Sequence, residues 1–216
     1  MPTYLAELLA QLKLFEGCVP WMYLDSAGNV TVGVGLMLPN AAAASALAFT
    51  AAGAPATPGQ IAADFARVAA LAPDKLPAFY QAASSPQLPQ EIIDAKLSAM
   101  LTGFEATIRA GILGYDALPD PVKMALLDMA YNLGPAGLLK GYPRMLQAVE
   151  SANWAQAAAQ CFRNGIGAAR NTWTQQQFLS AGIANISAAA ETEARSLLHR
   201  PTAWLKTIWR RLRPPH

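Results

Sequence analysis

The residues of this chain best suited to chemistry lie in the stretch FEGCVPWMYLDSAGNVTVGVG, which begins at Phe15 and ends at Gly35. This apolar, glycine-rich stretch contains two carboxylates, Glu16 and Asp25, nine residues apart, and the hydroxyl of Thr31 six residues further on. Two carboxyl groups in unlike surroundings suit acid/base catalysis, because one can hold a proton while the other stays ionised. The alternative interpretation is a helix-end charge followed by a turn residue.

The element that ends at Glu16 is predicted from hydrophobic periodicity. Four leucines and Phe15 recur at helical spacing, which predicts an amphipathic helix over residues 3–16. Thr3 is the predicted N-cap, and Gly17 is well placed to end the helix. Glu16 would then lie at the negative end of the helix dipole, where a carboxylate is unfavourable without a further reason.

The residues after this helix predict a β-hairpin that carries Asp25 and Thr31. An apolar run, WMYLD, precedes the turn SAGN and the alternating run VTVGVG. On the second strand Thr31, Gly33 and Gly35 face one side and three valines face the other. The nearly bare Thr31 side suits either the wall of a substrate site or close packing against a helix.

The remainder of the chain predicts a helical body. Residues 39–60 predict a short helix and an irregular connection, and helices are expected at about 61–82, 89–110, 119–132, 142–150, 153–163, 171–180 and 188–198. The expected fold is α+β and mainly α, with a small N-terminal hairpin lobe. We expect a domain over 1–182, with 39–88 as an extended insertion, and a C-terminal helical region over 183–216.

Composition limits the possible chemistry. Of the 216 residues 53% are hydrophobic and 14% are charged, so a sizeable core is expected. The two cysteines, Cys18 and Cys161, form either one long-range disulfide or, as we favour, two buried free thiols. The two histidines, His199 and His216, both lie near the end of the chain, so we expect no metal site, no cofactor and no histidine-based nucleophile.

Charge is distributed unevenly along the chain. Residues 1–193 carry 10 basic and 14 acidic residues, whereas residues 194–216 carry six basic residues and no acid. The main body therefore lacks the basic face of a nucleic-acid-binding protein. Residues 201–213 combine tryptophans with basic residues, which is typical of a helix on an anionic membrane or lipopolysaccharide, although docking on the body fits equally well.

The sequence predicts no leader and no membrane span. The N-terminus lacks the basic start, apolar middle and cleavage site of a signal peptide, and no uninterrupted apolar run reaches about 18 residues. We therefore expect a protein that is made in the cytoplasm and reaches other compartments only through cell lysis or a separate secretion system.

Two separate stretches resemble the phage-type lysozymes, glycoside hydrolase family 24. The family motif of E-G, Y-x-D and T-x-G-x-G matches EG at 16–17, YLD at 23–25 and TVGVG at 31–35, with the family's spacings. ALLDMAYNLGPAGL at 125–138 and GIGAARNTWTQQQFL at 165–179 are similar to later segments of the same family. Among related enzymes, the sequence of these segments is most similar to that of pesticin-like and secreted-effector muramidases. Leu36 stands where the family often has histidine.

The resemblance implies a lysozyme-like fold and an inverting muramidase (N-acetylmuramoylhydrolase) that acts on bacterial peptidoglycan. Glu16 would be the general acid, with partial desolvation favouring its protonated form. Asp25, in a wetter turn, would be the carboxylate, and Thr31 would orient a water beside it. The predicted substrate contacts are Tyr23, Gly33, Tyr131, Asn132 and Arg170.

Several alternatives stay open at this point. Arg170 is either the partner that holds Glu16 or a solvated turn residue, Asn132 equally suits a helix cap, and Tyr23 equally suits packing in the hairpin. The whole protein is alternatively a non-catalytic peptidoglycan-binding module or a lytic transglycosylase. It would reach periplasmic peptidoglycan after lysis, as an endolysin, or by secretion, as an effector toxin with an immunity protein.

Overall fold

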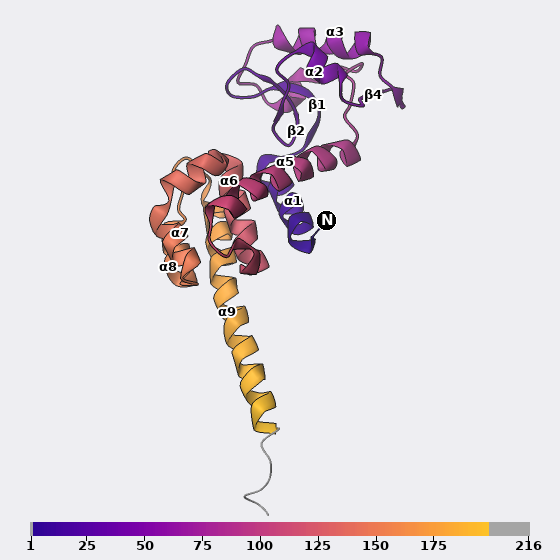
Figure 1. The fold of residues 1–216 in the computed structure, drawn as a ribbon. Coiled ribbons are helices and arrows are strands. Elements are labelled where there is room, and N and C mark those ends of the chain that lie inside the picture. Colours follow the sequence, from indigo (N-terminus) through magenta and orange to yellow (C-terminus); the bar gives the residue numbers. More distant parts are fainter. Residues whose placement is uncertain (1, 199–216) are drawn as a thin grey trace, which may run out of the picture.

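The structure, a computed structural model, describes the backbone of residues 2–198 and the side chains of residues 2–183. The predicted membrane-binding stretch, 201–213, lies outside the described residues. The fold of the described part is α+β and mainly α, as the sequence predicts. A small lobe of strands and short helices lies at one end, next to a body of helices, and the last helix leaves the body on the opposite side (Figure 1).

The elements follow the chain in a simple order. The first helix and the lobe comprise α1 (Thr3–Glu16), β1 (Val19–Leu24), β2 (Val30–Gly33), β3 (Leu36–Met37), α2 (Ala41–Ser45), β4 (Thr50–Ala51), β5 (Ala54–Pro55), α3 (Pro58–Ala69) and α4 (Pro77–Tyr80). The rest comprises α5 (Gln90–Gly111), the 3-10 helix η1 (Tyr115–Ala117), α6 (Asp120–Gly141), α7 (Pro143–Glu150), α8 (Trp154–Gln160) and α9 (Ala168–Leu198).

Helix α1 has the predicted bounds and places Glu16 as its last residue. The buried side chains Leu8 and Leu12 anchor its apolar face in the core. Gly17 ends the helix with a φ of +76°, a conformation that glycine adopts without strain. The prediction of Thr3 as N-cap is wrong, because Thr3 is already helical and Pro2 precedes it without a side-chain cap.

The predicted hairpin is present and gains a short third strand. β1, β2 and β3 form an antiparallel sheet in which Tyr23 pairs with Thr31. The Thr31 side of β2 is not bare: Thr31 is 2% exposed, and a Cβ on Gly33 would lie 3.1 Å from Cγ2 of Ile93 on α5. At Gly33 the glycine therefore permits close packing against a helix, the second of the two interpretations.

Three predicted helices have different bounds in the structure. The helix expected over 61–82 ends at Ala69, because Pro73 and Pro77 interrupt the pattern and Asp74 adopts a φ of +58°. The helices expected at 171–180 and 188–198 are one continuous helix, α9, which passes through position 182 without a break.

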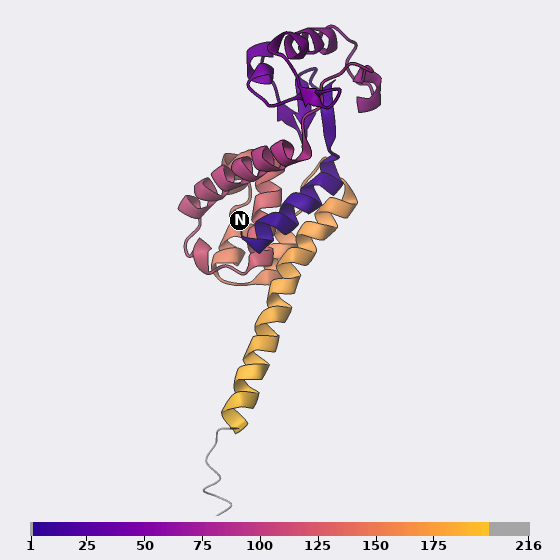
Figure 2. The same cartoon turned by 90° about the vertical axis from the view of Figure 1, so that its right-hand side faces the viewer.

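Helix α6 forms the centre of the body. α1, α5 and α9 pack against it, and its residues from Met124 to Ala130 are all buried. α1 and α9 lie side by side, as Figure 2 shows, with the Phe15 and Trp173 rings in edge contact at 5.8 Å. The last turn of α1 is thereby brought to the first turns of α9. Among the described residues, none of the helices combines the length and apolar content that crossing a membrane requires.

The packing of Gly33 against α5 can be tested by alanine substitution. Gly33→Ala should lower the free energy of unfolding by about 1–2 kcal/mol for its left-handed conformation, with an added penalty from the Ile93 contact. Gly28→Ala is the control, because Gly28 has a similar φ of +79° and nothing near its Cβ position. Equal losses for the two variants in urea unfolding would contradict the close packing described here.

Candidate active site

The residues singled out by the sequence come together where α1, the hairpin, α6 and α9 meet. Glu16 ends α1, and Asp25 directly follows β1. The Glu16 side chain is 32% exposed, so it is partly removed from water. Both carboxylates remain accessible, and each is held by a different set of contacts.

Asp25 is fixed by the turn that follows it. Its Oδ1 accepts hydrogen bonds from the backbone N–H groups of Ala27 at 2.9 Å and Asn29 at 2.8 Å, and its Oδ2 accepts one from the Asn29 amide at 3.2 Å. Partial burial alone would raise the pKa of Asp25, but these bonds and the Thr31 hydroxyl together lower it below the ordinary value of 3.8. Asp25 is thus kept as a carboxylate, as the sequence predicts.

Thr31 is a buried partner of the Asp25 turn. Its hydroxyl donates to the carbonyl oxygen of Asn29 at 3.2 Å and contributes to the lowered pKa of Asp25. The side chain is 2% exposed. A water held by Thr31 would therefore have to approach from the Asp25 side.

Tyr23 lies in the hairpin close to Asp25: it precedes Asp25 by two residues and pairs with Thr31 in the sheet. Burial raises the pKa of the Tyr23 phenol, and the nearby carboxyl groups of Asp25 and Glu16 raise it further. The phenol is within electrostatic reach of both carboxylates, although one ends a helix and the other a strand. No hydrogen bond of Tyr23 needs to be invoked for this conclusion.

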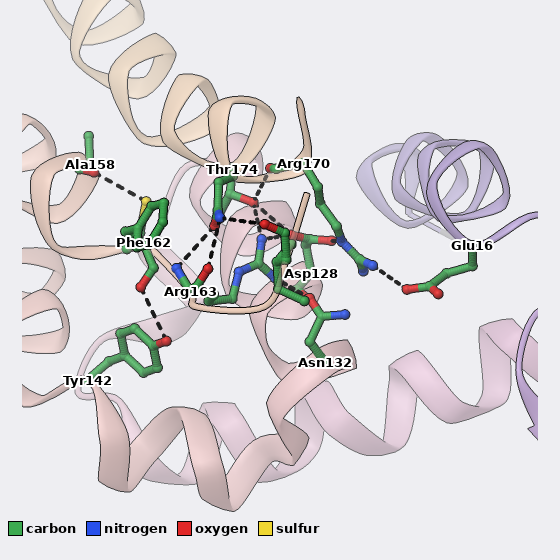
Figure 3. Close-up of polar contacts among 12 residues, drawn as sticks. Glu16, Asp128, Asn132, Tyr142, Ala158, Phe162, Arg163, Arg170 and Thr174 are labelled. Carbon is green, nitrogen blue, oxygen red and sulfur yellow. Dashed lines mark hydrogen bonds and ion pairs between the residues drawn. The ribbon is translucent and has the colours of Figure 1, made fainter. Parts of the chain in front are cut away.

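Arg170 forms the ion pair with Glu16 that the resemblance implied. Its Nη1 donates to Oε1 of Glu16, and its Nε donates to Oδ1 of Asp128 at 2.8 Å (Figure 3). The rings of Phe15 and Tyr131 lie 5.2 Å and 5.5 Å from the guanidinium carbon. Arg170 is buried at 7% exposure, so it is not a solvated turn residue, and its predicted contact with substrate stays a prediction.

Tyr131 connects the body to the lobe. Its hydroxyl on α6 donates to the carbonyl oxygen of Val34 at 2.6 Å. A Cβ on Gly35 would lie 3.3 Å from that hydroxyl, so the glycine leaves room for it. Burial raises the pKa of Tyr131, and Glu16 raises it further, which keeps the phenol protonated as a donor. This side chain lies beside the candidate site, as the sequence predicts.

Two predicted substrate contacts are engaged elsewhere. Gly33 faces Ile93 of α5 and lines an apolar hollow of about 260 Å³ between the hairpin and that helix. The amide oxygen of Asn132 accepts a hydrogen bond from Nη1 of Arg163, so Asn132 is not a backbone cap there. A larger hollow, of about 600 Å³, lies at the far end of α5 around Tyr115 and contains none of the predicted residues.

Sequence reasoning missed the buried cluster behind Arg170. Asp128 on α6 and Thr174 on α9 are both 0% exposed, and Arg163, just after α8, is 1% exposed. All three are joined by hydrogen bonds (Figure 3). One feature of the sequence could have indicated the cluster. Asp128 is the single charged residue in the apolar run ALLDMA, and a charge in a protein core is tolerated only when it is paired.

The cysteines are both free. Cys161 is buried, as expected, but Cys18 is partly exposed and its thiol lies 3.4 Å from Oε1 of Gln90. Among the described residues, no three histidine, cysteine, aspartate or glutamate side chains gather as a metal site requires. Comparison with protein-family models gives no match for this chain, and comparison with curated proteins gives none either.

The hydrogen bonds to Asp25 predict a pH-dependent contribution to stability. Because the folded state lowers the pKa of Asp25, its contribution is fully present above the ordinary value of 3.8 and is lost as the pH falls through the lower folded value. Asp25→Asn should remove that part of the acid sensitivity. Urea unfolding of both proteins from pH 7 to pH 2 measures it, and a stability gap that grows on acidification would contradict the assignment.

Proposed function

We propose that the protein is a muramidase that hydrolyses the β-1,4 bond between N-acetylmuramic acid and N-acetylglucosamine in bacterial peptidoglycan. The observation that carries the proposal is the pair of carboxylates around Tyr23. Glu16 is fixed by an arginine 154 residues away, and Asp25 is fixed by its own turn. Two carboxyl groups with different partners at one site are the requirement for glycoside hydrolysis.

The proposed division of labour follows from these partners. Glu16 ends its helix with a third of its side chain exposed, which suits delivery of a proton to the leaving oxygen. Asp25, kept ionised by its hydrogen bonds, would act as the base for a water on the opposite face of the sugar, with inversion of configuration. Thr31 would orient that water from beside Asp25. The resemblance of the two motifs to family 24 enzymes supports the same assignment.

Peptidoglycan digestion tests the reaction. Purified protein incubated with labelled sacculi should release soluble muropeptides with new reducing ends. Retention on sacculi without release would instead identify a non-catalytic wall-binding module. Products with anhydro ends, lighter by one water in mass spectrometry, would identify a lytic transglycosylase and overturn the assignment of Asp25 as base. The route to the periplasm, by lysis or by secretion, stays a prediction.

Substitution of the two carboxylates tests their roles. Glu16→Gln removes the proton at nearly constant shape, and Asp25→Asn removes the base, so each should lower the rate of reducing-end release by about 100- to 10,000-fold. Thr31→Ala should lower the rate less. Glu7→Gln is the matched control, since it makes the same change on the exposed side of the same helix. A loss under about tenfold for Glu16→Gln would contradict its role as general acid.

A further inference from the structure

The cluster behind Glu16 is a buried chain of charges that runs from α6 to the surface. Oδ1 of Asp128 accepts from Nε of Arg170 at 2.8 Å, while Oδ2 accepts from Nη2 of Arg163 and from the hydroxyl of Thr174, both at 2.7 Å. Arg163 also donates to the Asp128 carbonyl oxygen at 3.1 Å. Both oxygens of this carboxylate are therefore occupied, and its rotamer is fixed from two sides.

The charges of this cluster do not balance within the core. Arg163 and Arg170 bring two positive charges, and Asp128 brings one negative charge. Among the ion pairs of the described residues, Glu16 is the one other carboxylate that pairs with either arginine. A buried ion cluster is no more stabilising than well-packed apolar side chains, so stability alone does not account for it. Its ionic connection to the surface, among the described residues, is through the proposed proton donor.

Arg170 has little freedom to move between its two carboxylate partners. The rings of Phe15 and Tyr131 lie against its guanidinium, and Asp128 holds Nε. Its Nη2 is buried without a hydrogen-bond partner, so Nε and Nη1 are the two anchored nitrogens. A guanidinium is planar, and fixing Nε therefore fixes the direction in which Nη1 points. Figure 3 shows the resulting line from Asp128 through Arg170 to Glu16.

We propose that Asp128 is a positioning residue: held by Arg163 and Thr174, it fixes Arg170, and Arg170 orients the carboxyl group of Glu16. The inference rests on the proposed function for its effect on the reaction, because Glu16 is the proton donor there. Its geometric part, the dependence of Glu16 on Asp128, is independent of what the substrate is.

The experiment compares Asp128→Asn with a matched control in the lobe. Asp64 is also a buried carboxylate paired with an arginine, Arg67, at 2.8 Å, and its hydrogen-bond partners, Arg67 and Ser85, belong to the lobe rather than to the cluster behind Glu16. Asp64→Asn therefore makes the same chemical change at a buried carboxylate outside the cluster. We expect Asp128→Asn to lower the maximal rate on sacculi by about 10- to 100-fold, since a misplacement of about 1 Å costs about 100-fold. Asp64→Asn should keep the rate while lowering Tm.

Two further readouts separate positioning from general destabilisation. In the Glu16→Gln background, Asp128→Asn should have no additional effect on the residual rate, because both changes act through one group. In protein labelled with ¹³C-glutamate, Asp128→Asn should shift the Glu16 side-chain carboxyl resonance at pH 7, and Asp64→Asn should leave it unchanged. The second readout needs no substrate, so it remains decisive if wild-type protein releases nothing and the proposed function fails.

The outcomes that overturn the proposal are specific. A folded Asp128→Asn protein with wild-type rate and an unchanged Glu16 resonance contradicts it, as does an equal fall in rate for Asp64→Asn. If Asp128→Asn does not fold, Thr174→Val takes its place: it removes one hydrogen bond to Asp128 and keeps every charge. The same Glu16 resonance should then move by a smaller amount, and an unmoved resonance contradicts the proposal.

Discussion

The interaction on which the rest of this structure depends is the pairing of Asp128, a carboxylate without exposed surface, with Arg163 and Arg170. Removing two guanidiniums and a carboxylate from water is costly, and only near-complete hydrogen bonding makes the burial tolerable. The bonds come from α6, from the residue after α8 and from α9, so these segments must keep their relative positions. Helix α1 joins the same unit through Glu16. The ion cluster therefore helps to fix the relative positions of the helices that the apolar core holds together.

The two carboxylates of the candidate site are secured in different ways. Asp25 depends on contacts within five residues of chain, so the hairpin alone can form its surroundings. Glu16 depends on contacts made across the whole body. The lobe and the body are joined near the site by the Tyr131 hydroxyl, which reaches the carbonyl of Val34. Relative motion of lobe and body would act on this hydrogen bond and on the spacing of the two carboxylates together.

Local pattern was enough to predict the elements that carry the site. The leucines of α1, the stop at Gly17 and the turn of the hairpin are short-range signals, and the structure has them where expected. The C-terminal helices were predicted as two, at 171–180 and 188–198, whereas the structure has one helix through Gly182. A single glycine costs a helix only about 1 kcal/mol, which a long helix tolerates, and a Cβ on Gly182 would lie 3.6 Å from Cδ1 of Trp154.

The long-range part of the site was only partly predictable. Arg170 was found through a resemblance, whereas Asp128 and Arg163 were not found at all. Their pairing joins positions 35 residues apart, and no periodicity in the sequence reports such a contact. Glu16 is partly desolvated, as its apolar neighbours in the chain suggest, but the buried guanidinium beside it could not be read from those neighbours.

The position of Arg170 near the end of the body has a consequence for how the protein is synthesised. Glu16 and Asp25 leave the ribosome early, but the arginine that holds Glu16 follows 154 residues later. Asp128 emerges 35 residues before Arg163 and 42 before Arg170, and α6 cannot bury it at low cost until they arrive. The growing chain can thus complete its hairpin but not its site. Glu16 gains its arginine partner only once α9 has begun to emerge.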